Sequence, residues 1–240
     1  MKSFFITGAA GFIGSHVCEA IIKQFPKSKV FVLDKLTYAG NINFIKHLID
    51  KKKIIFIKCD MINIKKYSRY LKNIDCAINI AAESHVDNSF SNSINFTKTN
   101  VLGTHTFIQG CINNNIKKII HVSTDEVYGD KIKGKSKETD RLNPTNPYSA
   151  SKAAAEMIIN SYKFVHKKNI HSGSPAKHCD GFNDSLCRRD SVGLSCSNHD
   201  IHQSVGLHSM LFCNMRSRSS LSLCLSPSDR GVLLSLHHLQ

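Results

Sequence analysis

The stretch Thr7-Gly8-Ala9-Ala10-Gly11-Phe12-Ile13-Gly14 directly follows the apolar, β-rich segment Ser3–Thr7, and residues 12–24 have the pattern of a helix. Glycines in such a turn let the backbone approach a pyrophosphate, and the helix N-terminus offers amides and partial positive charge. Asp34 ends the next β-rich segment, 20 positions after Gly14. A carboxylate there can bind ribose hydroxyls and repels a 2′-phosphate, so the stretch predicts an NAD site rather than an NADP site. A structural turn cap is the alternative for Asp34.

Outward from this turn, β-rich segments alternate with helical ones. The expected strands are Ser3–Thr7, Val30–Asp34, Ile54–Lys58, Cys76–Ile80 and Lys118–Ser123. The expected helices lie near 12–24, 41–50, 63–71, 92–113 and 147–166. This alternation predicts an α/β fold with a doubly wound parallel sheet and right-handed crossovers, the Rossmann arrangement.

The use of residue types changes near residue 169. The first 170 residues hold 24 Lys, 2 Arg and 25 Ile, whereas the last 70 hold 1 Lys, 5 Arg and 1 Ile, with 15 Ser, 7 His and 5 Cys. We interpret residues 1–168 as a dinucleotide-binding domain that also carries the catalytic residues. Residues 169–240 then form an unmatched tail from another reading frame, a retained intron or a chimeric join, which replaces the C-terminal part. A lineage-specific disordered tail is the alternative.

The formal net charge of +14 raises nucleic acid or an anionic membrane as a partner. The lysines are spread along the chain without interleaved aromatic residues, so neither partner is expected. No apolar run approaches the roughly 18 residues of a membrane-spanning helix. The first β-rich segment starts at Ser3, which leaves no room for a signal peptide. We expect a cytoplasmic chain with reduced cysteines.

Further polar residues follow the segment at 118–123. Thr124-Asp125-Glu126 comes directly after it, and Tyr148 and Lys152 lie at the start of the last recognisable helix. At spacing i, i+4 these two side chains share a helix face. A lysine cation at ~4.5 Å and an effective dielectric of ~20 lowers a tyrosine pKa by about three units. The pair is therefore expected to act as a base at neutral pH, with Lys152 also holding the nicotinamide ribose.

With the glycine turn and Asp34, this arrangement resembles the extended short-chain dehydrogenase/reductase family. Thr124-Asp125-Glu126-Val127-Tyr128-Gly129 matches the dTDP-glucose 4,6-dehydratase family letter for letter. The other stretches that match this family are 34–41, 81–87, 99–104 and 144–148. The resemblance covers about residues 1–168 and implies bound NAD and a nucleotide-sugar substrate.

The resemblance also implies a role for each carboxylate. An epimerase of this superfamily only removes and returns a hydride at C4, whereas a dehydratase must also take a proton from C5 and protonate the leaving C6 hydroxyl. It implies that Tyr148 takes the 4-hydroxyl proton while Thr124 hydrogen-bonds the same oxygen. The resemblance further implies that hydride moves from C4 to NAD, after which Glu126 acts as the C5 base and Asp125 as the C6 acid. The hydride then returns to C6, which gives a 4-keto-6-deoxy sugar and regenerates NAD.

The candidate site residues fall into three groups. The catalytic candidates are Thr124, Asp125, Glu126, Tyr148 and Lys152. The expected NAD contacts are Gly8, Gly11, Phe12, Ile13, Gly14, Asp34, Lys35, Leu36, Thr37, Asp60, Met61, Ala81, Ala82, Ser84, Thr99, Tyr148 and Lys152. The substrate contacts implied by the resemblance are Ser84, His85 and Thr124. No metal site is expected, because the tail residues Cys179, Cys187, Cys196, His199 and His202 lack ligand spacing.

In the family the chain continues into two more strands and a smaller nucleotide-binding domain. Without them the strand at 118–123 is expected to be an unpaired sheet edge, which is an aggregation hazard. Three interpretations stay open: a dehydratase acting on a nucleoside-diphosphate glucose, dTDP-glucose foremost; an inactive NAD-binding fragment; and a sugar epimerase or decarboxylase, which the Asp125-Glu126 pair disfavours. Family members pair helices across a two-fold axis, so residues 92–113 and 147–166 predict a homodimer.

Overall fold

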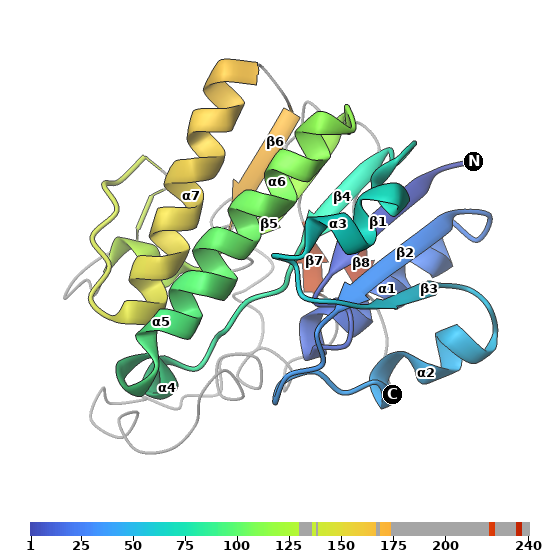
Figure 1. Ribbon diagram of the computed structural model, residues 1–240, viewed down its shortest axis with the longest axis horizontal. Coiled ribbons are helices and arrows are strands. Elements are labelled where there is room, and N and C mark those ends of the chain that lie inside the picture. Colours follow the sequence, from blue (N-terminus) through green and yellow to red (C-terminus); the bar gives the residue numbers. More distant parts are fainter. Residues whose placement is uncertain (130–135, 138, 167–168, 174–220, 224–233, 237–240) are drawn as a thin grey trace, which may run out of the picture.

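A computed structural model of the chain describes residues 1–129, 136–137, 139–166 and 169–173, and the backbone of 221–223 and 234–236. Its main sheet is parallel throughout, with the order β3-β2-β1-β4-β5-β6 (Figure 1). The strands are β1 (Ser3–Thr7), β2 (Lys29–Asp34), β3 (Ile55–Lys58), β4 (Cys76–Asn79), β5 (Lys118–Val122) and β6 (Asn169–Gly173). The order reverses direction between β1 and β4, which confirms the expected doubly wound Rossmann arrangement.

Helices cover both faces of this sheet. They are α1 (Phe12–Gln24), α2 (Asn43–Asp50), α3 (Ile64–Tyr67), α4 (Val86–Ser91), α5 (Ser93–Phe96), α6 (Thr104–Asn113) and α7 (Pro147–His166). Short helical turns are η1 (Ser68–Leu71), η2 (Thr97–Gly103) and η3 (Asp125–Tyr128). A small antiparallel pair, β7 (Leu221–Leu223) and β8 (Leu234–Leu236), lies outside the main sheet. The single helix expected at 92–113 is thus divided, because η2 has π-helical hydrogen bonding.

The two faces of the sheet have separate apolar cores, because neighbouring residues on a strand point to opposite faces. Phe4 and Ile6 pack with apolar residues of α1 and α2. Phe5, between them in the sequence, packs on the face of α3, α6 and α7. Its ring is fully buried, with its centroid 5.8 Å from those of both Tyr67 and Phe107. These rings anchor the helices that lie in front of the sheet in Figure 1.

The expected unpaired edge at β5 is wrong. β6 pairs with β5 along its whole length, from Lys118 opposite Asn169 to Val122 opposite Gly173. Ile170 is buried in the core on the α7 face. Backbone N–H and C=O groups make the pairing with β5, so one buried apolar side chain is enough to pack this strand against the core. The rest of the expected tail, apart from β7 and β8, lies outside the described residues, and its origin stays a prediction.

We predict that Phe5→Ala lowers the free energy of unfolding by about 3–5 kcal/mol, because it leaves a cavity between two packed rings. Urea denaturation followed by circular dichroism measures the change. Phe164→Ala is the matched control: its ring is 86% exposed on α7, and the same substitution there should stay within about 0.5 kcal/mol. Equal effects of the two substitutions would contradict the assignment of Phe5 to the core.

Candidate active site

The glycine turn lies where the sheet order reverses. Gly8 has a φ of +71°, and a Cβ atom on it would come within 2.6 Å of the Ala81 amide nitrogen at the end of β4. A Cβ on Gly14 would come within 2.0 Å of the Gly8 carbonyl oxygen. Glycine at both positions therefore lets α1 begin close to the ends of β1 and β4. Gly11 is the N-cap of α1 and makes no side-chain cap, so the helix presents its first amides, those of Phe12 and Ile13, at this crevice.

Asp34 joins the turns that follow β1 and β2. One carboxylate oxygen accepts the Ala10 amide at 2.9 Å, and the other accepts the Leu36 amide at 2.7 Å. The side chain is 8% exposed. The turn cap that the sequence left as an alternative is therefore present. Because each carboxylate oxygen has a second lone pair, the cap leaves capacity for a ribose hydroxyl.

Asp60 lies two residues after Lys58, the last residue of β3. Its side chain accepts the Ile62 amide at 3.0 Å and forms an ion pair of 2.7 Å with Lys35. Burial disfavours the charged carboxylate, but the Lys35 ammonium and the Ile62 amide outweigh burial and lower the pKa of Asp60. Met61 is buried, and its carbonyl oxygen accepts the Tyr67 hydroxyl at 2.6 Å. The Met61 carbonyl is therefore already engaged, and the residue can contact a cofactor only through its side chain or its amide.

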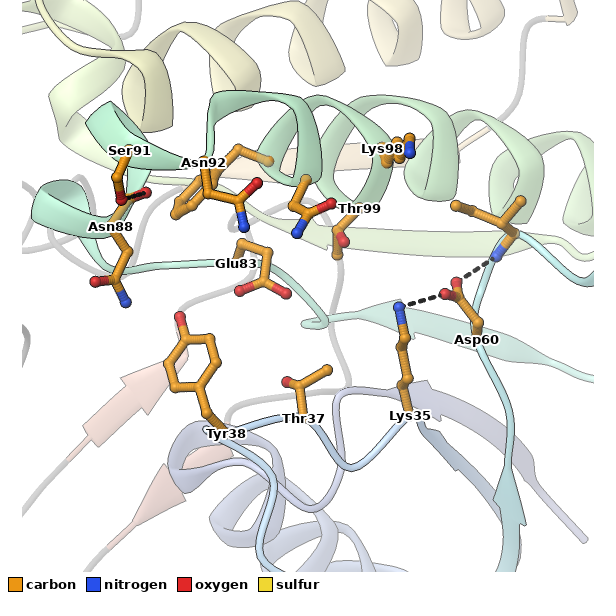
Figure 2. Close-up of a pocket in the computed structure, with 13 residues that line it drawn as sticks. Lys35, Thr37, Tyr38, Asp60, Glu83, Asn88, Ser91, Asn92, Lys98 and Thr99 are labelled. Carbon is orange, nitrogen blue, oxygen red and sulfur yellow. Dashed lines mark hydrogen bonds and ion pairs between the residues drawn. The ribbon is translucent and has the colours of Figure 1, made fainter.

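A cavity of about 510 Å³ opens at this crevice and brings four of the expected cofactor contacts together (Figure 2). They are Lys35, Thr37, Asp60 and Thr99. In Figure 2, Thr37 and Tyr38 from the loop after β2 face Asn88 of α4 and Asn92, which lies between α4 and α5, with Glu83 between them. The cavity has a polar wall on both sides, as a ligand with hydroxyls and phosphates requires.

Several lining residues were missed in the sequence. Tyr38, Glu83, Asn88, Asn92, Asn95 and Lys98 line the cavity but were not among the candidates. Burial and the nearby Glu83 carboxylate raise the pKa of Tyr38, whose ring centroid lies 5.6 Å from that of the exposed His85. Tyr38 and Glu83 stand inside stretches that match the dehydratase family, which was the available signal. Asn88 and Asn95 lie in α4 and α5, and Asn92 lies between these two helices. None of the three carries such a signal.

Asn100 holds the segment that carries Ser84 and His85. Its amide accepts the Glu83 N–H at 2.8 Å and donates to the Glu83 carbonyl at 2.9 Å and to the Ser151 hydroxyl at 2.9 Å. Asn100 is 1% exposed and comes from the π-helical turn η2. It therefore ties the end of β4 to α7, and so joins the expected cofactor contacts to the helix of Tyr148.

Thr124, Asp125, Glu126 and Tyr148 converge after β5. Thr124 is the N-cap of η3, and its hydroxyl accepts the Glu126 amide at 3.3 Å and donates to Asp125 at 3.4 Å. The turn after the strand places both carboxylates near Tyr148, and the negative charge of each raises the pKa of its phenol. Glu126 also accepts the Asn146 amide at 3.2 Å. The four side chains thus offer a hydroxyl, two acids and a phenol in one place.

The expected lowering of the Tyr148 pKa is wrong for this arrangement. Burial first, and then the Glu126 and Asp125 charges, raise the pKa to about 12, against a smaller lowering by the hydrogen bond with Thr124. Lys152 does not offset them, because its Nζ donates instead to the Val122 carbonyl at 2.7 Å. Burial lowers the pKa of Lys152 to about 8, with the Glu156 carboxylate opposing.

The lysine shift predicts a pH-dependent stability. An unfolded lysine has a pKa of ~10.4, whereas buried Lys152 has a pKa of about 8. Between these values the unfolded chain holds the proton and the folded chain does not, so this cost to stability is full below pH ~8 and fades toward pH ~10.4. The variant Lys152→Met lacks this cost. Its free energy of unfolding, relative to that of the native chain, should therefore be about 3 kcal/mol higher at pH 7 than near pH 10.5.

Urea unfolding of both chains across this pH range measures the difference. Lys163→Met, at an exposed position on the same helix, controls for the loss of one lysine. A stability difference between Lys152→Met and the native chain that does not change with pH would contradict the buried, weakly basic state of Lys152.

The family follows from comparison with known proteins. The model of a family described as GDP-mannose 4,6 dehydratase matches residues 5–180. The chain belongs to this family of nucleotide-sugar dehydratases, in agreement with the resemblance noted in the sequence.

Its relatives include the dTDP-D-glucose 4,6-dehydratase of Dictyostelium discoideum, 44% identical over 175 residues, which are 68% of this chain and 40% of the relative. A trifunctional UDP-glucose 4,6-dehydratase of Arabidopsis thaliana is 43% identical over 67% of this chain and 25% of its own. A crystal structure of the Streptomyces venezuelae dTDP-glucose 4,6-dehydratase with NAD bound is 36% identical, with a TM-score of 0.67. That match covers 71% of this chain and 54% of the solved one. The chain therefore spans about half the length of these relatives or less.

Within the described part of the chain, no helix is long and apolar enough to cross a membrane. Among the same residues, no group of three or more His, Cys, Asp or Glu side chains is arranged to hold a metal ion. The tail cysteines and histidines considered for zinc, from Cys179 to His202, lie outside the described residues.

Proposed function

We propose that the chain carries the NAD-dependent half of a nucleoside-diphosphate-glucose 4,6-dehydratase, with dTDP-glucose as the foremost substrate. The observation that carries this proposal is the convergence of Glu126 and Asp125 on the Tyr148 phenol beside the Thr124 hydroxyl. Epimerisation at C4 needs no such pair of acids, whereas removal of water across C5 and C6 needs one base and one acid.

The crevice fits NAD by its shape and charge. The uncapped start of α1 suits a pyrophosphate, and Gly8 and Gly14 leave no side chain in its way. The Asp34 carboxylate suits a ribose diol and repels a 2′-phosphate. Relatives solved with NAD bound support the same cofactor. NAD bound there would supply a hydride acceptor that can return the hydride later in the cycle.

The residues divide the proton transfers among them. Tyr148 takes the proton of the sugar 4-hydroxyl, and the Thr124 hydroxyl hydrogen-bonds the same oxygen. Oxidation at C4 makes the C5 proton acidic, so Glu126 can remove it while Asp125 gives a proton to the departing C6 hydroxyl. Tyr148 can act near neutral pH only if the Lys152 ammonium turns from the Val122 carbonyl toward the phenol, because burial and the two acids hold the phenol protonated.

Two other functions remain for the test to decide. One is an inactive NAD-binding fragment; the matched residues are 40% of the Dictyostelium relative. An epimerase is favoured by a solved UDP-N-acetylglucosamine 4-epimerase from Methanobrevibacter ruminantium, 29% identical with a TM-score of 0.66. That match covers 71% of this chain and 53% of the epimerase.

The decisive experiment incubates residues 1–240 with NAD and dTDP-glucose or UDP-glucose in deuterated water. A 4-keto-6-deoxy product with deuterium at C5 supports the dehydratase. A 4-epimer without C5 exchange supports the epimerase, and NAD binding without turnover of either sugar supports the inactive fragment.

In an active chain, Glu126→Gln should abolish C5 exchange and lower kcat about 10²–10⁴-fold, because the C5 base is lost. Asp125→Asn should keep C5 exchange while blocking loss of the C6 hydroxyl. The exposed Asp50→Asn is the control for loss of a carboxylate. Undiminished dehydration by Glu126→Gln would remove the role assigned to Glu126.

We propose a homodimer formed through the helices that follow β4 and through α7. Exposed apolar side chains gather on these elements: Phe90, Ile94, Leu102 and Met157 are 48–66% exposed. Figure 1 shows α6 and α7 side by side on one face of the sheet. α4, α5 and η2, which carry three of them, each contact α7, which carries the fourth. Exposed apolar groups on neighbouring elements are typical of a surface that a partner covers.

Sedimentation of the native chain should therefore give a dimer, and Leu102→Glu with Met157→Glu should give a monomer. Phe44→Glu, at an equally apolar but 44% exposed site on α2, should remain a dimer. A monomeric native chain, or a dimer that Phe44→Glu disrupts equally, would contradict this interface.

We propose the cytoplasm as the compartment of this reaction. Cys18, Cys59, Cys76 and Cys111 are buried thiols rather than disulfides in the described part of the chain. Burial raises the pKa of Cys18 to about 12, which keeps it an unreactive thiol. Reduced cysteines of this kind fit a reducing compartment.

A further inference from the structure

A chain of buried polar side chains crosses the sheet from β1 to Lys152. The Thr7 hydroxyl donates to the Asn79 side-chain oxygen at 2.6 Å, and the Asn79 Nδ2 lies 3.0 Å from His121 Nδ1. His121 Nε2 lies 3.5 Å from Lys152 Nζ. All four residues are at most 3% exposed. These hydrogen-bonded side chains thus join β1, which Gly8 directly follows, to the lysine of the candidate reaction site.

The orientation of the Asn79 amide follows from its neighbours. The Thr7 hydroxyl oxygen accepts the Ile80 and Ala81 amides at 3.2 and 3.3 Å, so its own proton goes to Asn79. The Asn79 oxygen therefore faces Thr7 as an acceptor. Its NH₂ group then has one hydrogen for the Thr104 hydroxyl at 3.1 Å and one for His121 Nδ1.

This orientation selects one tautomer of His121. Because Nδ1 accepts a hydrogen bond from Asn79, the neutral ring must carry its proton on Nε2. A doubly protonated ring would set Nδ1–H against the Asn79 NH₂ group, in a site with 1% exposure. The Nε2–H bond then points at the Lys152 amine, and two donors meet whenever that amine is an ammonium.

The other groups around Lys152 do not remove this conflict. On its own helix, the Glu156 carboxylate favours the ammonium and Tyr148 lies one turn earlier. On β5 the Val122 carbonyl accepts one of its hydrogens. On β6 the residue opposite His121 is Ser172, which is uncharged. The tautomer of His121 therefore decides how the ring meets Lys152. A proton on Nε2 repels the ammonium, whereas a bare Nε2 would accept a hydrogen bond from it.

We propose that His121 is a positioning residue for Lys152. Its hydrogen bond with Asn79 fixes the Nε2–H tautomer, and this N–H directs the lysine amine toward the Val122 carbonyl and disfavours the ammonium form. The inference rests on the proposed function only for the role given to Lys152. The side-chain arrangement links the cofactor end of the sheet, through Thr7 and Asn79, to the charge of the reaction-site lysine.

The first test reads the tautomer directly in the native chain. Residues 1–240 labelled with ¹⁵N-histidine are followed by two-bond ¹H–¹⁵N spectra from pH 6 to 9, with His121 assigned by its loss in His121→Gln. We expect a neutral Nε2–H ring throughout. A ring protonated on Nδ1, or one that titrates in this range, would overturn the proposal.

The second test reads the lysine. With ¹³C-lysine labelling and assignment by Lys152→Arg, the Lys152 titration should move up by about one pH unit or more in His121→Gln, because a glutamine carbonyl can accept from the ammonium. His105→Gln, an exposed histidine on α6, should leave it unchanged. An unchanged or lower Lys152 titration in a folded His121→Gln would refute the positioning role.

Neither readout requires turnover, so the two proposals can fail separately. If no sugar is dehydrated but Lys152 responds as expected, the proposed function fails and the role of His121 stands. If dehydration occurs and Lys152 does not respond to His121→Gln, the opposite holds.

Discussion

The close approach of two strand ends at Gly8 is the constraint on which this structure depends. No side chain fits there, since any Cβ would meet the Ala81 backbone at 2.6 Å. That contact brings the turn before α1 against the end of β4, and the Asp34 carboxylate then ties the same turn to the end of β2. The crevice, its cavity and the start of α1 all take their positions from these short-range contacts, which a single methyl group would disrupt.

Much of the fold could be predicted because its signals are local. Strands and helices alternate along the chain, and the glycine turn and Asp34 stand at the ends of apolar segments, where parallel strands place their site residues. Thr124, Asp125 and Glu126 were also found together, because a helical turn begins at Thr124. Each of these predictions needed only a few neighbouring residues.

The rest depends on contacts between residues far apart in sequence. Asn100 holds the Glu83 backbone and Ser151, and no periodicity marks it. The position of Lys152 against Val122 could not be read from the i, i+4 spacing to Tyr148, because spacing gives a shared face and not the direction of a flexible side chain. The pairing of β6 was missed for a related reason: a composition that departs from the preceding chain says little about backbone hydrogen bonds.

The pairing of β6 bears on how such a chain tolerates change. A sheet recognises an added strand mainly through regularly spaced amides and carbonyls, which every residue except proline supplies in full. Of the five residues from Asn169 to Gly173, Ile170 is the one buried as part of the apolar core. The edge of a parallel sheet therefore accepts a strand that carries few apolar residues. Four of the five positions of such a strand can therefore vary while its backbone pairing is kept, so this edge of the sheet tolerates sequence change better than the strands at its centre.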